Sequence, residues 1–584
     1  MITSSKDIYR VVAVTPNLIQ IEVIDTVAFK ADSANTLTLG SCLRISDENE
    51  LSIIAIVQSY RIKDVIPDEQ QAAPQQPHFI VDAQLVGFLD EKGNFKRGGL
   101  QIAIPPTKVE IADQSILESI YSAVSPEKVF SFGTLALNDS IRVQVDGDRF
   151  FGKHIAVVGS TGSGKSCTVA KLLQEGIQPS DDQGKKGVLN NSHIVLFDLH
   201  GEYCTAFPSA NCLDVGNMIL PYWLMNSEEL EDMFIDTGDQ NAHNQISQFK
   251  HAVIENKLRH NDGLKITYDT PVYFSINEVY RYIRNQNLAT KNYSTGEPEI
   301  SEPAEGVEAK YQFFEDIKFV PTAREKVSRG AYAGEFDRFV SRLETKLNDA
   351  RLSFLLHPHK ENNDEHKTED FESLLKQFIG YDDRSKSNLT IIDLSGVPFE
   401  VVSVVVSLIT RLIFDFCFYF KKVRTNISEV PVLLVYEEAH NYMPNSAIAK
   451  YRSVRESIER VAKEGRKYGI SLMIVSQRPS EIAETIFSQC NNFVAMRLTN
   501  PTDQNYIKRL LPDSVSVITD SLPALEKQEA LVIGDAIAMP TIMKVDQIIQ
   551  KPKSADVAFH QEWQKDWYEV AFKALLDSMQ CRKK

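Results

Sequence analysis

Residues 159–166 are the feature that most constrains the fold of this chain. They read Gly-Ser-Thr-Gly-Ser-Gly-Lys-Ser, a complete G-x-x-x-x-G-K-[ST] phosphate-binding loop. The apolar run His154–Val158 precedes the loop, and the helix-compatible stretch 167–173 follows it. A strand, a glycine-rich turn and a helix in this order place backbone N–H groups around a phosphate at a helix N-terminus. The sequence therefore predicts an α/β nucleotide-binding core; a glycine-rich turn without a ligand is the alternative interpretation.

The positions of this loop have separate expected roles. Its glycines let backbone N–H groups surround the β-phosphate, Lys165 reaches the β- and γ-phosphate oxygens, and the Ser166 hydroxyl can bind Mg²⁺. We therefore predict ATP and Mg²⁺ as cofactors. The predicted nucleotide-binding residues are Gly159, Ser160, Thr161, Gly162, Ser163, Gly164, Lys165, Ser166 and Cys167.

Length and hydropathy are typical of a globular protein with several domains. The chain has 584 residues, 43% of them hydrophobic and 24% charged, which predicts about two to four domains. It has no uncharged apolar run of about 18 residues, and charged residues interrupt any apolar stretch near the N-terminus. The longest apolar stretch, 401–420, contains Arg411 and Asp415 and therefore predicts a buried helix. We expect a cytoplasmic protein with no membrane span.

Cysteine spacing and net charge narrow the class of protein further. The seven cysteines lack C-x-x-C or zinc-ligand spacing, so we expect reduced thiols in a reducing compartment. The net charge of −16 argues against a protein whose whole surface binds nucleic acid. It still allows a ring that contacts DNA through a few cations on loops inside a pore. The cysteines are Cys42, Cys167, Cys204, Cys212, Cys417, Cys490 and Cys581.

The first 112 residues contain short β-like runs separated by turns, a pattern typical of a small antiparallel barrel. The stretch 68–77, DEQQAAPQQP, predicts a mobile loop. The predicted strands are Tyr9–Val14, 18–29, 41–45, 51–62, Phe79–Leu89 and 109–111.

From about residue 150, strands alternate with helices, which predicts a parallel sheet. The strand signal mostly vanishes between about 215 and 385, where polar, helix-compatible sequence predicts an insertion. The predicted strands are His154–Val158, 193–197, 389–392, Val432–Tyr436, 472–475, 493–497 and 530–533. Near the C-terminus, apolar side chains recur on one helical face and must be buried somewhere, for example on a neighbouring subunit. They are Trp563, Trp567, Val570, Ala571, Leu575 and Met579.

These patterns divide the chain into four predicted segments. A β-barrel occupies 1–145, and an α/β ATPase core is built from 146–215 and 386–545. A helical insertion occupies 216–385 within that core, and a helical tail occupies 546–584.

Three predicted strands end in an acidic residue, but only one ends in two adjacent carboxylates, Glu437 and Glu438. Adjacent residues leaving a strand point to opposite sides. We therefore predict that Glu437 holds Mg²⁺ through water and that Glu438 acts as general base or positions the attacking water. Solvated acids at a strand end are the alternative. The acids after the other two strands, Asp198 and Asp393, fit turn-capping roles as well as catalytic ones.

Two further groups complete the predicted active site. Gln477 follows the next strand and is expected to contact the γ-phosphate or attacking water; a satisfied polar residue at a sheet edge is the alternative. The stretch 455–467 is a charged helix that precedes this strand. Arg466, with Arg460 as second choice, is predicted to enter the active site of a neighbouring subunit. Surface ion pairs such as Glu459 with Lys463 are the alternative.

Five motifs in a fixed order carry a resemblance to a known family. They read GSTGSGKS, FDLHGEY, NLTIIDLSGVP, VLLVYEEAHNYMP and EGRKYGISLMIVSQRP. Between about 150 and 535 the chain resembles the HerA-like branch of the HerA/FtsK ATPases, with a DUF87-type motor. The β-rich N-terminal segment resembles the HAS barrel that precedes HerA motors. One departure is Glu437, which stands where many relatives have aspartate.

The resemblance implies a RecA-like P-loop ATPase core of the ASCE type, assembled as a homohexamer with ATP at the subunit interfaces. It implies a translocase or helicase that moves double-stranded DNA through the central pore. It also gives Asp198 and Glu202 a possible place near the nucleotide. The expected pore loop is 445–455, whose Lys450, Arg452 and Arg455 would contact phosphates without reading sequence; solvated loop charges are the alternative.

The family resemblance further implies a separate partner protein. A NurA-like nuclease or a sirtuin-type NAD-degrading effector would dock on the barrel, in DNA processing or anti-phage defence. An ATP-gated ring scaffold that organises an effector with little DNA movement is the competing function. Glu438 and Gln477 favour the motor, because a scaffold does not need hydrolysis. The length of the chain and its arginine-bearing helix do not favour a monomeric P-loop kinase.

Overall fold

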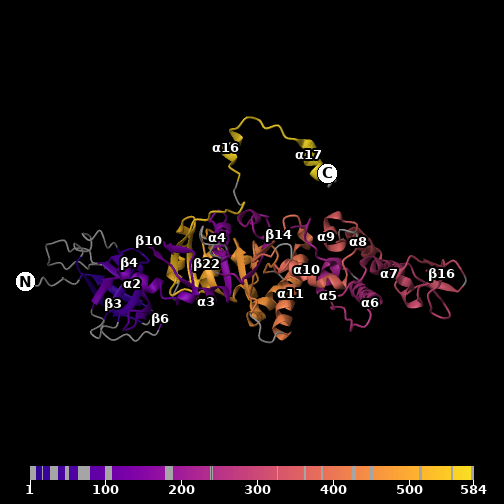
Figure 1. Cartoon of the computed structure of the whole chain (residues 1–584), viewed down its shortest axis with the longest axis horizontal. Coiled ribbons are helices and arrows are strands. Elements are labelled where there is room, and N and C mark those ends of the chain that lie inside the picture. Colours follow the sequence, from indigo (N-terminus) through magenta and orange to yellow (C-terminus); the bar gives the residue numbers. More distant parts are fainter. Residues whose placement is uncertain are drawn as a thin grey trace, which may run out of the picture.

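The structure is a computed structural model, and its parts follow one another along the longest axis (Figure 1). The N-terminal sheet lies at one end, a large central sheet in the middle, and the insertion at the other end. The predicted loop 68–77 lies outside the residues that the structure describes. These are 8–15, 18–25, 37–46, 52–62, 79–98, 108–177, 189–236, 238–239, 241–324, 326–358, 360, 364–382, 386–423, 429–445, 452–511, 516–553 and 557–579.

The N-terminal sheet is antiparallel, in the order β1-β2-β5-β4-β3-β7, with β6 paired to β5. Alternate residues of β2, such as Ile19 and Ile21, enter a small core on one face. β7 also lies close to β1, but no ladder joins these two edges in the described residues. The predicted antiparallel strands are confirmed, as a half-open barrel. The bounds are β1 Tyr9–Val14, β2 Leu18–Val23, β3 Cys42–Ser46, β4 Ser52–Ile62, β5 Phe79–Leu89, β6 Phe95–Arg97 and β7 Lys108–Ile111.

The central sheet has the order β10-β9-β24-β23-β22-β12-β21-β20-β13-β19-β14. Its strands from β22 to β14 are parallel, and those from β23 to β10 are antiparallel. The predicted parallel sheet is therefore confirmed, but β9, β10, β14 and β24 were not predicted. The bounds are β9 Gly133–Leu135, β10 Asn138–Arg142, β12 His154–Val158, β13 His193–Asp198, β14 Asn211–Leu213, β19 Leu389–Asp393, β20 Val432–Tyr436, β21 Ile470–Ser476, β22 Cys490–Ala495, β23 Glu529–Gly534 and β24 Thr541–Val545. A separate two-stranded pair joins β8 (Val129–Phe130) to β11 (Val145–Asp146).

Helices cover both faces of this sheet, because alternate strand residues point to opposite sides. In β12, Ile155 and Val157 enter the core that contains α4 (Lys165–Ile177). Ala156 and Val158 enter the opposite core with α11 (Phe399–Val423) and α12 (Arg452–Glu464). This two-sided burial explains why the strand is apolar throughout. The remaining helices around the sheet are α2 Gln114–Tyr121, α3 Gly147–Phe151, α13 Glu484–Phe487, α14 Pro501–Leu510 and α15 Ser516–Thr519.

Helix α11 is long and apolar enough to cross a membrane by length and composition alone. In the protein, 78% of its most apolar window is buried. Its side chains pack between the central sheet and the insertion. The prediction of a buried helix over 401–420 is therefore confirmed.

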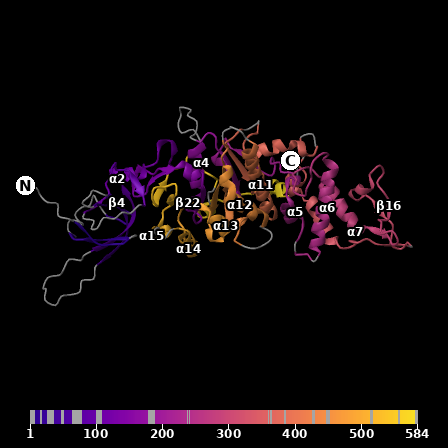
Figure 2. The ribbon, with the colours of Figure 1, turned by 90° about the horizontal axis from the view of Figure 1, so that it is seen from below.

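The insertion is mainly helical and extends beyond the central sheet in both views (Figure 2). Its helices are α5 Ser227–Phe234, α6 Ala242–His260, α7 Ile276–Leu288, α8 Asp337–Leu347, α9 Ser353–Leu356 and α10 Phe371–Phe378. Four short strands, which the sequence did not predict, form two ribbons within it. They are β15 Thr290–Asn292, β16 Ile300–Glu302, β17 Lys318–Phe319 and β18 Val327–Arg329.

A buried ion pair joins the insertion to helix α11, which packs on the central sheet. Glu229 in α5 is fully buried and lies 2.8 Å from Arg411 in α11, which also donates to the Leu224 carbonyl. The same carboxylate accepts the Asn226 N–H and completes a capping box at the start of α5. The helix start and the contact between domains therefore depend on one side chain.

The C-terminal tail runs away from the body and holds two short helices, α16 (Phe559–Trp563) and α17 (Phe572–Met579) (Figure 1). The prediction of one apolar helical face is wrong, because Trp567, Val570 and Ala571 lie in the non-helical stretch between α16 and α17. Its aromatic side chains are largely exposed, with Trp563 at 78% and Trp567 at 91%. The prediction that this face is buried on a neighbouring subunit stays a prediction.

The Arg411–Glu229 pair should be essential for stability. Arg411→Met leaves a fully buried carboxylate without its charged partner, so we expect the free energy of unfolding to fall by about 3–5 kcal/mol. Urea denaturation measures this loss. Lys318→Met, which breaks an exposed pair with Glu302, is the control and should change stability by less than about 1 kcal/mol. Equal losses in both variants would contradict the expectation.

Candidate active site

The phosphate-binding loop connects β12 to α4 through a backbone that requires glycine. Gly162 and Gly164 have φ values of 76° and 99°, which residues with a Cβ rarely adopt. A Cβ on Gly159 would lie 2.5 Å from Ser163 Oγ. That oxygen is buried, with no hydrogen-bond partner in the described part of the chain. The loop therefore keeps a polar interior that a bound phosphate can satisfy.

Lys165 and Glu438 meet across the sheet edge. Lys165 Nζ lies 3.2 Å from Glu438 Oε1, and both side chains are less than a tenth exposed. Glu438 has a φ of 45°, in the left-handed region that is strained for glutamate and typical of functional sites. Its second carboxylate oxygen lies 3.3 Å from Nδ1 of His440, whose pKa is lowered by burial. The sequence interpretation missed His440, which follows the acidic pair by two residues.

Glu437 occupies a strongly acidic environment. Its Oε2 atom is buried, with no hydrogen-bond partner among the described residues. Burial, followed by the carboxylates of Glu438 and Asp198, raises the pKa of Glu437 well above its ordinary value. A cation at this position would relieve both the repulsion and the missing partner.

Gln477 contacts the phosphate-binding loop directly. Thr161 Oγ1 donates a hydrogen bond of 2.6 Å to Gln477 Oε1. The two residues meet because β21 pairs in parallel with β12 on one side and with β20 on the other. The structure thus brings Gln477 between the loop and the acidic pair, while its role stays a prediction.

The other two strand-end acids hold turns. Asp198 accepts backbone N–H groups of His200, Gly201 and Tyr203 at 3.3, 3.0 and 2.8 Å. Asp393 accepts the Ser395 N–H at 2.9 Å. Both have the turn-capping geometry that was one of the two interpretations. A direct role of Asp198 with the nucleotide stays a prediction.

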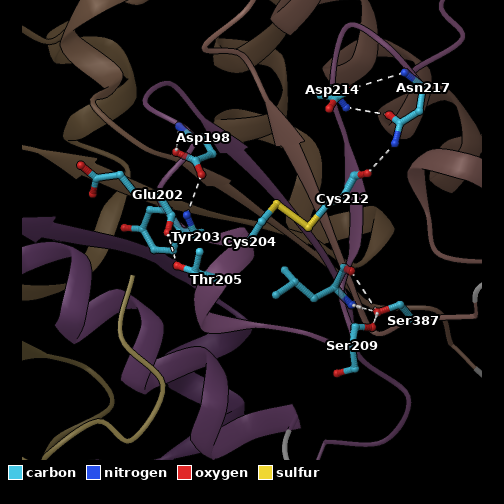
Figure 3. The surroundings of a disulfide bond; sticks show 12 residues. Asp198, Glu202, Tyr203, Cys204, Thr205, Ser209, Cys212, Asp214, Asn217 and Ser387 are labelled. Atoms are coloured by element: carbon cyan, nitrogen blue, oxygen red, sulfur yellow. Dashed lines mark hydrogen bonds between the residues drawn. A yellow bond between two sulfur atoms is a disulfide. The ribbon is translucent and has the colours of Figure 1, made fainter. Parts of the chain in front are cut away.

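The turn that Asp198 organises brings Glu202 and Tyr203 next to Ser166, and the two side chains point to the same side of it (Figure 3). Burial raises the pKa of Glu202, and the Asp198 carboxylate raises it further. Burial and then the Glu437 carboxylate raise the pKa of Tyr203 well above its ordinary value, so the phenol keeps its proton. The sequence interpretation missed Tyr203, although it directly follows Glu202 in the quoted motif.

The same turn is tied to the segment that leads to the tail. The Lys553 N–H donates to the Glu202 carbonyl at 2.9 Å. Thr205 Oγ1 donates to the Lys551 carbonyl at 3.4 Å. The root of the tail is therefore attached beside Ser166.

Cys204 and Cys212 form a disulfide, with Cα atoms 6.3 Å apart (Figure 3). The expectation of seven reduced thiols is wrong for this pair. Their separation of eight residues matches no redox or metal motif, so the sequence offered no signal for it. The bond links the turn after β13 to β14, and it lies on the side of the turn away from Glu202 (Figure 3). The free cysteines among the described residues are Cys42, Cys167, Cys417 and Cys490.

The two candidate arginines differ in their surroundings. Arg466 lines a cavity of about 510 Å³ together with the first residues of β13, β20 and β21. These strand starts form the edge of the sheet opposite the phosphate-binding loop. Arg460 instead stacks on Phe414 at 4.2 Å and lies 3.9 Å from Asp415 within its own chain. Because Arg460 is engaged by Phe414 and Asp415 of its own chain, Arg466 is the better candidate for contact with a neighbouring subunit.

The helix that carries these arginines also holds the ion pairs of the alternative interpretation. Lys463 pairs with Glu459 at 2.9 Å, as that alternative predicted. Of the predicted pore-loop cations, Arg452 and Arg455 start α12 and pair with acids four residues later. Lys450 lies outside the described residues.

The donor set fits one Mg²⁺ held jointly with a nucleotide. No group of three or more His, Cys, Asp or Glu side chains in the described ranges is arranged to hold a metal alone. Mg²⁺ at nucleotide sites needs only one or two protein carboxylates besides phosphates and water. Ser166 and the unpartnered Glu437 supply such a set, so these two residues would hold the ion.

Comparison with known proteins identifies the family that this chain resembles. The family model described as "Helicase HerA, central domain" matches residues 130–413. The chain is a HerA-like ATPase. Its sequence is 24% identical to the probable DNA double-strand break repair helicase HerA of Methanocaldococcus jannaschii, over 87% of this chain and 92% of the relative.

One further relative and one solved structure are similar to this HerA-like ATPase. It is 25% identical to the DNA double-strand break repair helicase HerA of Saccharolobus solfataricus, covering 79% of this chain and 77% of that one. The structure of VirB4 of Thermoanaerobacter pseudethanolicus superposes with a TM-score of 0.45 at 14% identity, covering 73% of this chain and 98% of that one. The site lies on a RecA-like P-loop core with the strand order β22-β12-β21-β20-β13.

The disulfide should be detectable and stabilising. Denatured, unreduced protein should react with a thiol reagent at two fewer cysteines than reduced protein, as measured by mass spectrometry. The double variant Cys204→Ser/Cys212→Ser should lose about 2–3 kcal/mol of unfolding free energy, because closing a short loop restricts the unfolded chain. Reducing agent should abolish the difference between the wild type and the variant. An equal thiol count before and after reduction would contradict the bond.

Proposed function

We propose that this HerA-like ATPase is a motor that hydrolyses ATP to move double-stranded DNA, with helicase activity. The observation that carries the proposal is the meeting of Lys165, Glu438, Thr161 and Gln477 at one sheet edge. A hydrolytic site needs a phosphate-binding cation, a water-orienting acid and a group that responds to the γ-phosphate. The relatives named as DNA double-strand break repair helicases support DNA as the substrate of the motor.

Each side chain has a separate role in the proposal. Lys165 binds the β- and γ-phosphates, and Ser166 and Glu437 would hold Mg²⁺, which would neutralise phosphate charge. Glu438 orients and activates the attacking water. Glu438 is paired with Lys165, and a bound phosphate would give Lys165 a second anionic partner. Gln477 transmits the state of the γ-phosphate through Thr161.

The functional unit in this proposal is a homohexamer. Arg466 lies at the sheet edge opposite its own phosphate-binding loop, so its natural target is the site of a neighbouring subunit. Helix α12, with Arg452 and Arg455, together with Lys450, would contact DNA phosphates in the central pore. The exposed aromatic side chains of the tail support contact with another subunit.

The motor in this proposal acts with a separate partner protein. A separate NurA-like nuclease or a sirtuin-type NAD-degrading effector would dock on the N-terminal barrel, in DNA processing or in antiviral defence. The family resemblance of the motor supports a separate partner. The sequence of this chain contains no nuclease motif of its own.

Turnover with and without DNA tests the proposed function. ATP hydrolysis should rise when linear duplex DNA is added, and the stimulation should fall steeply as salt increases, because phosphate contacts release counterions. Glu438→Gln should still bind ATP but lose hydrolysis by about 10²–10⁴-fold. Glu464→Gln, an exposed acid on α12, is the matched control. Turnover that ignores DNA would instead support an ATP-gated scaffold.

Subunit mixing tests the role of Arg466. Lys165→Ala and Arg466→Ala should each reduce hydrolysis by about 10³-fold or more. Mixed rings should recover part of the activity, because some interfaces combine an intact loop with an intact arginine. The control is a mixture of Arg460→Ala and Lys165→Ala subunits, because Arg460 is engaged within its own chain. Failure of Arg466→Ala to recover activity in mixed rings would count against its action in trans.

A further inference from the structure

Tyr203 is buried beside the nucleotide-binding loop but is not explained by the roles above. Its side chain is fully buried, and its ring belongs to the core that also contains α4. The turn that carries it is fixed by Asp198, which accepts the Tyr203 N–H at 2.8 Å. Cys204, the next residue, is held by the disulfide. The position of the phenol is therefore set by the backbone on both sides.

The hydroxyl of Tyr203 is buried and makes no hydrogen bond of normal geometry in the described part of the chain, where its one weak side-chain interaction is with Ser166, the predicted Mg²⁺ ligand. Other buried tyrosines contrast with it: Tyr222 donates to the Phe274 carbonyl, and Tyr442 donates to the Glu437 carbonyl. A buried polar group without a partner costs free energy, and phenylalanine would avoid that cost. A hydroxyl at this position is therefore expected to bind something outside the protein chain.

The surroundings of the hydroxyl indicate what it binds. Ser166 lies beside it, and the carboxylates of Glu437 and Asp198 lie nearby. Tyr268 and Tyr506 also have buried hydroxyls without a partner, but they lie in the insertion and in α14, away from the loop. Only Tyr203, among these three, adjoins the two residues assigned to Mg²⁺. Ser166 and Glu437 leave several positions around that ion to water.

We propose that Tyr203 is a positioning residue for the Mg²⁺ of the bound nucleotide, and that its hydroxyl donates a hydrogen bond to a water ligand of that ion. The inference rests on the proposed nucleotide site and adds a residue to it. The carboxylates around the site can only accept hydrogen bonds when ionised, whereas the phenol can donate one. Such outer contacts orient the ligands of a metal and raise its affinity.

Binding of a fluorescent ATP analogue, with Mg²⁺ or with EDTA, tests the proposal in the full-length chain. Tyr203→Phe keeps the ring and removes only the hydroxyl. We expect the Mg²⁺ concentration needed for tight binding to rise about tenfold, while metal-free binding stays at the wild-type value. Tyr506→Phe, which removes another buried hydroxyl without a partner, should leave both values unchanged.

The outcomes separate this inference from the wider proposal. Unchanged metal-free binding by Tyr203→Phe shows that the variant folds and retains the loop. Wild-type Mg²⁺ dependence in Tyr203→Phe would overturn the role of Tyr203 and leave Ser166 and Glu437 unaffected. A wild-type protein that binds the analogue equally with and without Mg²⁺ would overturn the magnesium site and Tyr203 together. DNA-stimulated turnover is a separate measurement, and its absence would not change these affinities.

Discussion

The position of β21 between β12 and β20 is the constraint on which the site depends. Parallel pairing aligns the ends of the three strands, so the phosphate-binding loop, Gln477 and the Glu437–Glu438 pair emerge at one edge. The short contacts Lys165–Glu438 and Thr161–Gln477 follow from this register. The insertion leaves the sheet after β14 and returns before β19.

The parts of the fold that the sequence predicted are those with a strong local pattern. The buried strands around β12 are continuous apolar runs, and the phosphate-binding loop has fixed glycines, so both could be identified from neighbouring residues. The short strands β9, β10, β14 and β24 could not, because three to five residues carry little periodicity and these strands exist only by pairing with distant partners. The ribbons of the insertion were missed for the same reason.

The candidate site shows a similar division. Lys165, Glu437, Glu438 and Gln477 could be named because each follows a recognisable strand or motif. The contacts of His440 and Tyr203 depend on a left-handed residue and on a turn held by one carboxylate, neither of which has a sequence signature. The Cys204–Cys212 bond was misjudged because its spacing is not a known motif, and only the return of the chain through β14 brings the two residues together.

Two hydrogen bonds, from Lys553 to Glu202 and from Thr205 to Lys551, hold the start of the tail in place. They attach its first residues to the same turn that carries Tyr203. The turn beside Ser166 and the start of the aromatic-rich tail are therefore one hydrogen-bonded unit, so the nucleotide site and the base of the tail share a single anchoring point.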